Sequence, residues 1–424
     1  MKRSILLLLS LVMATFFGLA ACGSKEEGGD NGGGKTKGVT LTIGSWRTED
    51  KAGYEKIIKA FNEKYPDIHV EFKPTKNTEY DTILNTNLKA GSGPDIIQLR
   101  PYAPGMALAK SGYLEPLDDV DGLAQFPKMI LEAATGEDGK VYGVPLSINT
   151  AQIFYNKDIF KKYHLSEPKT WDDLIAIAKT LKKNGVVPFA FGTKDGWLLS
   201  LSHSIIGPAF YGKDFPDQIA KGDVDFTDPK FVDSLKAMKA ITPYFPDKYT
   251  GLGEVDDRTL FASGQAAMYV EGSFDIEPVR QLNPNLDLGF FPMPSASGGE
   301  PTITTWVDSS YGINAHSKHK KEAKKFIEFL TTKAFGKLFT DTFKRPSAIP
   351  GIASEDPLVA ALSKTADQDA VPYFILTTFN SGNPTTKATL ESNLQAMYLG
   401  KMQPEDVAKS LQESAKTWFA PFKK

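Results

Sequence analysis

The stretch of sequence that determines the fold class is Val39–Leu99, VTLTIGSWRTEDKAGYEKIIKAFNEKYPDIHVEFKPTKNTEYDTILNTNLKAGSGPDIIQL. Apolar residues alternate as in strands at 39–43 and 68–72, and they recur at helical spacing at 54–61 and 80–88. Residues 95–99 form a short apolar run that is typical of a buried strand. The order strand, helix, strand, helix, strand predicts a parallel sheet with right-handed crossovers. In such a sheet ligands bind beyond the carboxyl ends of the strands.

The same pattern continues toward the C-terminus, which predicts an α/β protein throughout. Residues 151–155 and 186–191 have the pattern of strands. Thr170 and Asp173 stand at capping-box spacing before an apolar helical face, and Asp228-Pro229 is a typical helix start. Further helices are predicted at 323–330 and in two segments of the C-terminal tail that Gly400 separates.

The N-terminus has the composition of an export signal. Met1-Lys2-Arg3 is basic, an apolar run follows, and residues 19–22 read LAAC, which resembles the lipobox of bacterial lipoproteins. We therefore predict a signal peptide at 1–21, a lipid on Cys22 and a Gly-rich flexible tether at 22–38. This predicts a protein that is lipid-anchored at the extracellular face of a bacterial cell membrane. The alternative is an ordinary secretory signal with a cysteine nearby by chance.

Composition narrows the function classes. Cys22 is the only cysteine, so the sequence offers no intrachain disulfide and no multi-cysteine metal site. The net charge is −2 and there is no basic block, so nucleic acid is not an expected partner. We expect no metal and no cofactor, because the five histidines show no ligand pattern. A chain of 424 residues exceeds the usual size of one core, which predicts two lobes.

Eight phrases in order give the chain a family resemblance. They are FNEKYPDIHV at 61–70, AGSGPDII at 90–97, GYLEPL at 112–117, YGVP at 142–145, FYNK at 154–157, PKTWDDL at 168–174, FASGQAAM at 261–268 and GS at 272–273. Together they resemble the extracellular solute-binding proteins of carbohydrate ABC importers, the maltose-binding-protein-like group.

The resemblance implies a two-lobe, periplasmic-binding-protein-like fold, in which each lobe is a mostly parallel sheet flanked by helices and a hinge joins the lobes. By analogy, lobe 1 comprises 39–148 plus 312–350, and lobe 2 comprises 149–311 plus 351–424. The implied function is capture of a sugar or oligosaccharide by cleft closure and its delivery to the membrane permease of an ABC importer. The expected protein is a monomer and not an enzyme.

A sugar packs its C–H face on aromatic rings and needs converging polar groups for its hydroxyls. Trp46 and Arg47 directly follow the first strand, Arg100 and Tyr102 follow the strand at 95–99, and Trp197 follows the strand at 186–191. We take these five as candidate ligand contacts. Each also has a structural alternative, such as rim packing for Trp46 or a surface ion pair for Arg100.

Eight weaker candidates complete the predicted site. Asp50 could instead cap the following helix, and Tyr80 lies on an apolar helical stripe that favours core packing. Trp306 and Asp308 precede the second predicted hinge crossing, where hinge packing is the alternative. By resemblance to the family we add Asn149 from the first crossing and Glu271 and Phe274 from the stacking position, and we add Arg345, which precedes Pro346. We expect Trp171 to pack as core.

Two other functions remain open from sequence alone. A cell-surface glycoside hydrolase needs two carboxylates roughly 5–10 Å apart, and Glu271 and Asp308 are available acids. A binding protein for a non-sugar solute, such as a peptide, a polyamine or a metal, is the other. The aromatic candidates favour sugar.

Overall fold

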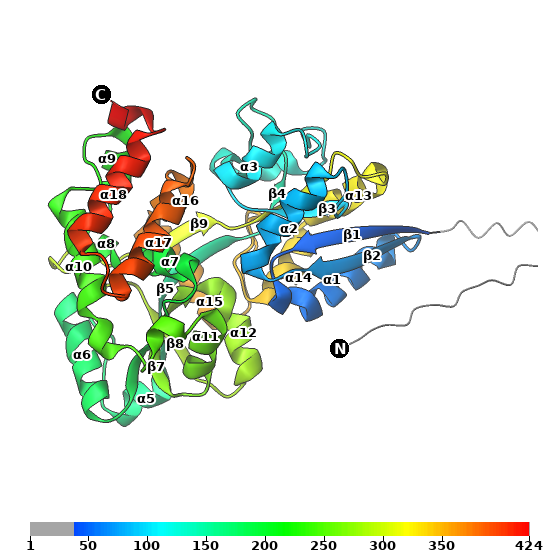
Figure 1. Ribbon diagram of the computed structural model, residues 1–424. Coiled ribbons are helices and arrows are strands. Elements are labelled where there is room, and N and C mark those ends of the chain that lie inside the picture. Colours follow the sequence, from blue (N-terminus) through cyan, green and yellow to red (C-terminus); the bar gives the residue numbers. More distant parts are fainter. Residues whose placement is uncertain (1–37, 424) are drawn as a thin grey trace, which may run out of the picture. The chain divides into compact units, whose positions relative to one another are not determined.

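The computed structural model describes residues 38–423. The predicted signal peptide, Cys22 and the tether up to Lys37 lie outside the described residues. Within them, no helix combines the length and the apolar character that a membrane crossing requires. The described chain contains two sheets, each covered by its own helices (Figure 1). We call each sheet with the helices packed on it a lobe.

The first sheet has the strand order β2–β1–β3–β10–β4. Its strands are β1 (Val39–Ser45), β2 (Ile68–Pro74), β3 (Ile96–Leu99), β4 (Val144–Pro145) and β10 (Ser310–Ile313). β1 pairs in parallel with both β2 and β3, as the opening stretch of sequence predicts. β10 is antiparallel to β3 and β4 because the chain enters this sheet from the second lobe.

Helices of the first lobe are α1 (Lys51–Lys64), α2 (Asn77–Lys89), α3 (Ala103–Lys110), α4 (Lys128–Leu131), α13 (Lys320–Leu330) and α14 (Lys333–Phe343). The apolar faces of α1, α4, α13 and α14 form one buried cluster with the sheet, in which Phe61 packs edge-on against Phe326, and those of α2 and α3 form a second cluster. The predicted apolar stripe at 323–330 is the buried face of α13.

The second sheet has the order β11–β9–β5–β7–β6, and β8 also pairs with β5. Its strands are β5 (Ile148–Asn156), β6 (Val187–Ala190), β7 (Ala266–Gly272), β8 (Leu288–Phe291), β9 (Ile303–Val307) and β11 (Ala370–Pro372). The α/β two-lobe class is confirmed, but this sheet is mixed rather than mostly parallel. The reason is β5, which carries the chain away from the first lobe and is antiparallel to β7, β8 and β9.

Helices of the second lobe are α5 (Lys157–Lys162), α6 (Trp171–Lys183), α7 (Gly196–Ile206), α8 (Pro208–Tyr211), α9 (Phe215–Lys221), α10 (Pro229–Ala240), α11 (Glu254–Ala262), α12 (Ile276–Leu282), α15 (Pro357–Asp369), α16 (Phe374–Thr377), α17 (Thr386–Tyr398) and α18 (Pro404–Lys416). The Thr170–Asp173 capping box begins α6 as predicted, and Asp228 caps α10. Gly400, at φ 74°, separates α17 from α18.

Three short segments cross between the lobes side by side and form the hinge. The Leu146 backbone N–H donates to Ser309 at 2.9 Å, and the Asp308 N–H donates to Ser147 at 3.0 Å. The third segment joins them through Ala348, whose N–H donates to Leu146 at 3.0 Å. The exact residue bounds of the two lobes stay a prediction.

Candidate ligand-binding site

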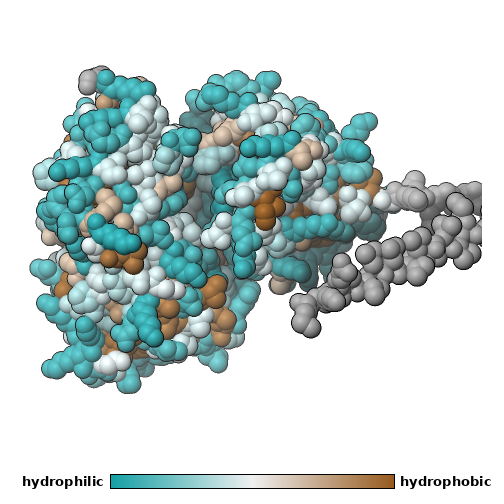
Figure 2. Space-filling model, in the orientation of Figure 1, coloured by the Kyte–Doolittle hydropathy of each residue, from teal (hydrophilic) through white to brown (hydrophobic). Residues whose placement is uncertain are grey.

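A cavity of about 930 Å³ lies between the two lobes, near the upper end of the usual size range of small-molecule sites. The face shown in Figure 2 is mostly hydrophilic and is hollowed between the lobes. From the first lobe, each of β1, β2 and β3 presents the residues after its carboxyl end to the cavity. These are Trp46 and Arg47 after β1, Lys76 to Thr78 after β2, and Arg100 after β3.

The second lobe follows the same rule. The cavity wall includes residues at or just beyond the carboxyl ends of β6, β7, β9 and β11, namely Trp197, Phe274, Trp306, Asp308 and Tyr373. β5 runs in the opposite direction, so its amino end meets the hinge. The strand direction within each sheet therefore explains which loops build the cavity.

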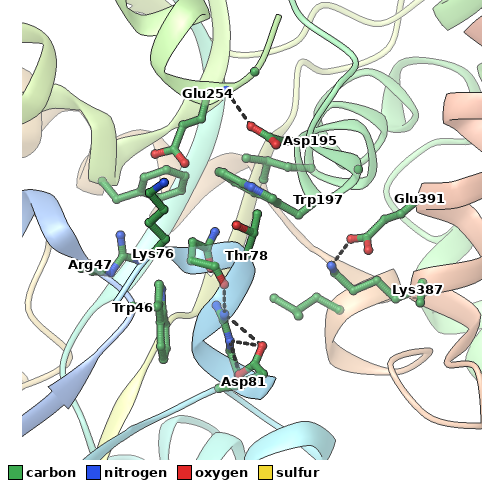
Figure 3. Close-up of a pocket in the computed structure, with 18 of the residues that line it drawn as sticks. Trp46, Arg47, Lys76, Thr78, Asp81, Asp195, Trp197, Glu254, Lys387 and Glu391 are labelled. Atoms are coloured by element: carbon green, nitrogen blue, oxygen red, sulfur yellow. Dashed lines mark hydrogen bonds and ion pairs between the residues drawn. The ribbon is translucent and has the colours of Figure 1, made fainter. Parts of the chain in front are cut away.

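Aromatic rings lie on both sides of the cavity. In the second lobe, Trp306 packs edge-on against Tyr373 and Phe274, with centroids 5.6 and 6.3 Å apart. The ring centroid of Trp197 lies 6.2 Å from that of Phe274, and Trp197 is only partly buried, so part of its side chain remains accessible. Figure 3 shows Trp46 and Trp197 on opposite sides of the cavity. A flat apolar face of a ligand would therefore meet a ring from either lobe.

Trp46 is more enclosed than Trp197. The Arg100 guanidinium carbon lies 4.1 Å from the Trp46 ring centroid, and Tyr80 packs edge-on at 5.6 Å. Because these neighbours already cover part of the indole, Trp46 offers a ligand less free surface than Trp197 does.

An ion pair at the bottom of the cavity connects the first lobe to the hinge. The Arg47 guanidinium donates to Asp308 Oδ2 at 2.5 Å, and both side chains are nearly buried. Arg47 also lies 5.2 Å from the ring centroid of Phe274, in the second lobe. Arg47 thus contacts the hinge and the aromatic wall at once.

Most charges on the cavity wall are paired with each other. Besides Arg47–Asp308, the pairs are Arg100–Asp81, Arg258–Glu254 and Lys387–Glu391. In the described chain, the wall residues without a side-chain ion pair are two lysines and two aspartates: Lys76, Lys194, Asp195 and Asp256. With Glu49, which also pairs with Arg47, the wall holds seven acidic and six basic residues, so its charges nearly balance, which suits a neutral polar ligand better than an ionic one.

Glu254 is a wall carboxylate with a strongly displaced pKa. Burial, with smaller contributions from Asp275 and Glu49, raises the pKa of Glu254 to about 7 against the opposing effect of Arg258. Its side chain accepts from Arg258 at 2.5 Å. The folded protein thus favours the neutral form of Glu254 relative to a free glutamate.

This shift predicts a pH-dependent contribution to stability. The carboxyl pKa of Glu254 is higher in the folded protein than the unfolded value of 4.5, so binding of its proton stabilises the fold. This contribution is fully present below pH 4.5 and is lost as pH rises through about 7. The free energy of unfolding of wild type, relative to Glu254→Gln, should fall by about 3 kcal/mol between pH 4.5 and 8. Urea denaturation of both proteins at these two pH values measures the change, and a constant difference would contradict it.

Seven of the thirteen predicted site residues line the cavity: Trp46, Arg47, Arg100, Trp197, Phe274, Trp306 and Asp308. The structure brings these residues together from segments far apart in the sequence. Their contact with a ligand stays a prediction. Trp171 packs edge-on against Phe210 and does not line the cavity.

Asp50 and Arg345 form a buried pair with each other and are not part of the cavity wall. Arg345 donates to both carboxylate oxygens of Asp50, at 2.8 and 2.6 Å, and neither residue lines the cavity. The two charge-assisted hydrogen bonds hold both side chains in place and give the pair a structural role.

Two predicted tyrosines also lie behind the wall. The Tyr80 hydroxyl donates to the Gln98 carbonyl at 2.8 Å in the first-lobe core, which matches the core-packing alternative. The Tyr102 hydroxyl accepts from the Val307 N–H at 3.2 Å, and burial raises its pKa to about 12. Both hydroxyls are thus engaged by the backbone, outside the cavity wall.

Asn149 and Glu271 are fully buried and are likewise absent from the wall. Asn149 is paired with Trp306 across β5 and β9, so the neighbouring strand covers it. Glu271 accepts from the Gly272 N–H at 2.9 Å, and burial raises its pKa well above the usual value. The glycosidase alternative requires two carboxylates that face the same space. Glu271 and Asp308 do not, because only Asp308 lines the cavity.

The sequence interpretation missed wall residues of two kinds. Lys76, Asn77 and Thr78 follow a predicted strand, so the rule that selected Trp46 could have found them. Lys387 and Glu391 lie on α17, and nothing in their local sequence indicates the cavity. Among the described residues, no group of three or more histidine, aspartate or glutamate side chains is placed to hold a metal.

Comparison with known proteins agrees with this geometry. Residues 44–337 match the family model of the bacterial extracellular solute-binding protein. The multiple sugar-binding protein of Streptococcus mutans is 28% identical over 358 residues, covering 82% of this chain and 83% of that protein. The melibiose/raffinose/stachyose-binding protein of Bacillus subtilis is 24% identical, covering 97% and 95%.

A similar solved structure is that of RafE, a solute-binding protein in complex with raffinose. It has a TM-score of 0.76 and 26% identity, over 91% of this chain and 100% of that chain. The family model spans more than half of the chain and includes both crossings through Ser147 and Asp308. This chain belongs to the bacterial extracellular solute-binding protein family.

Proposed function

We propose that this protein binds a sugar in the cavity between its lobes and delivers it to the permease of an ABC importer. The observation that carries the proposal is the wall itself, with indole rings on both sides, of which Trp197 is the more accessible, and with charges that are mostly paired. Indole rings pack on the C–H face of a sugar, and paired charges bind hydroxyls without demanding an ionic ligand.

The site chemistry supports binding rather than turnover. Asp308 is held by Arg47, and Glu254 is held by Arg258, so each carboxylate has a fixed cationic partner. We therefore propose a binding protein without catalytic activity, which acts as a monomer. The relatives whose names state a ligand are sugar-binding proteins, which favours a carbohydrate over a peptide, polyamine or metal.

We also propose that Cys22 carries the lipid that anchors the protein outside the cell membrane. The support is the sequence LAAC at 19–22 and the family's extracellular placement. Residues 22–38 would then join the anchor to β1.

A thermal-shift experiment tests the function. The panel is galactose, melibiose, raffinose, stachyose, xylose, xylotriose, N-acetylglucosamine and chitotriose. A sugar that binds only the native state at 100 times its Kd adds about 2.7 kcal/mol to the unfolding free energy, so Tm rises. Spermidine and a tripeptide are the controls for non-sugar solutes. A Tm that no sugar raises, or that only a control raises, contradicts the proposal.

A further inference from the structure

The family match ends at residue 337, yet part of the cavity wall lies beyond it. The helix α17, together with the segment before it, supplies Asn380, Lys387, Glu391, Ser392 and Gln395. Figure 3 shows Lys387 and Glu391 on the side of the cavity away from Trp46 and Arg47. The match to the family model therefore does not extend to this part of the wall.

Glu391 is positioned by Ser200 of α7, which Tyr373 holds in turn. Ser200, on α7, donates to Glu391 Oε1 at 2.8 Å, and the Tyr373 hydroxyl donates to Ser200 at 2.6 Å. Lys387 pairs with the same oxygen, Oε1. Among the described residues no donor to Glu391 Oε2 is present, and that oxygen belongs to a residue of the cavity wall. The carboxylate is fixed while one oxygen remains able to accept from a hydroxyl.

Gln395 is fixed in the same manner. Its amide nitrogen donates to the Lys194 carbonyl at 2.7 Å, and the residue belongs to the cavity wall, so its amide oxygen stays available as an acceptor. The first residue of α7, Gly196, lies directly against α17, since an added Cβ there would be 3.2 Å from Glu391 Cβ. Glu391 and Gln395 therefore stand next to the Trp197 platform and not next to Trp46.

A carboxylate, an ammonium and an amide held beside an indole form a second set of polar contacts. The first set is Arg47 with Asp308 at the hinge, near Phe274 and Trp306. A single sugar ring on the hinge set leaves the α17 set without hydroxyls to bind, and a cavity of about 930 Å³ has room beyond one ring.

We propose that Asn380, Lys387, Glu391 and Gln395 form an outer subsite for a second sugar unit, so that the protein prefers oligosaccharides to monosaccharides. This inference rests on the proposed function. The outer subsite raises affinity only for ligands long enough to reach α17 from the hinge.

Isothermal titration calorimetry of the full mature chain tests the outer subsite. Galactose with raffinose, xylose with xylotriose, and N-acetylglucosamine with chitotriose supply matched short and long probes. Wild type should bind the long member of a recognised pair at least ~10-fold more tightly than the short one. Glu391→Gln should weaken the long sugar ~10- to 100-fold, since a lost bond to a charged group is large, and weaken the short sugar by less than ~3-fold.

Ser392→Trp provides a second variant, because Ser392 is exposed on the wall and a large side chain there blocks the outer subsite without touching the core. It should reproduce the selective loss. Glu413→Gln, in an exposed pair with Lys416 on α18, is the matched control and should change neither affinity.

Equal losses for short and long sugars, or no loss for the long sugar in either variant, would overturn the outer subsite. Equal affinity of wild type for the short and the long sugar would also overturn the outer subsite, but it would leave the proposed function intact. Binding of no sugar in any pair overturns both, and this distinguishes the two failures.

Discussion

Trp197→Ala should lower the affinity for the recognised sugar by about 2–3 kcal/mol, which is roughly a 30- to 150-fold increase in Kd. Trp197 is the second residue of α7, and its half-buried indole lies on the cavity wall 6.2 Å from Phe274. A ring that stacks on a sugar loses that apolar contact when it is truncated, and alanine supplies nothing in its place. Calorimetry of wild type and variant with the same sugar measures the change.

Trp171→Ala is the matched control for this prediction. Trp171 is also partly buried and near a helix start, but it packs on Phe210, with ring centroids 5.0 Å apart, and it is not part of the cavity wall. Its removal should lower stability and leave Kd unchanged. If both variants lost affinity equally, or if Trp197→Ala lost none, Trp197 would not be a sugar platform.

Asp50→Ala should lower the free energy of unfolding by about 3–5 kcal/mol at pH 7. Asp50 and Arg345 form a two-bond ion pair, with side chains that are 5% and 2% exposed. Removing the carboxylate leaves a buried guanidinium without its charge partner, and this desolvated charge is costly. Urea denaturation gives the difference directly.

Two further variants separate this effect from general sensitivity. Glu137→Ala breaks the exposed Lys110–Glu137 pair, whose side chains are 70% and 78% exposed, and should cost at most about 1 kcal/mol. The double variant Asp50→Leu with Arg345→Met should recover most of the loss, because it removes both charges together. A loss after Asp50→Ala no larger than that of Glu137→Ala would show that the pair does not stabilise the hinge side of the first lobe.

The fold was largely predictable because its signals are local. Alternation at 39–43 and the stripe at 54–61 became β1 and α1, and the Thr170–Asp173 spacing became a capping box. The direction of β5 was not predictable by the same means. Alternation identifies a strand, but it carries no information on whether the neighbours run parallel or antiparallel.

Part of the site was predictable from position after a strand, and part from the family resemblance, which gave Phe274. Position after a strand identified Trp46, Arg100 and Trp197, all of which line the cavity. The pairing of Asp50 with Arg345 joins residues 295 positions apart, and no pattern in a single sequence shows such a partner.

The part of the cavity wall that α17 contributes could not be predicted from the sequence either. Glu391 reaches the cavity because α17 packs against α7, and that packing follows from apolar faces that many alternative arrangements could satisfy. A polar residue on an amphipathic helix has the same local sequence whether it faces solvent or a ligand. Its role became visible only with Ser200 and Tyr373 in place.

A crystal structure with the sugar that raises Tm most tests the central claim most directly. The proposed site predicts a sugar enclosed between the lobes, with one ring against Trp197 and hydroxyls bound to Arg47 or Asp308 from the hinge side. A sugar that contacts only one lobe, or that occupies a surface outside the cavity, would contradict the account.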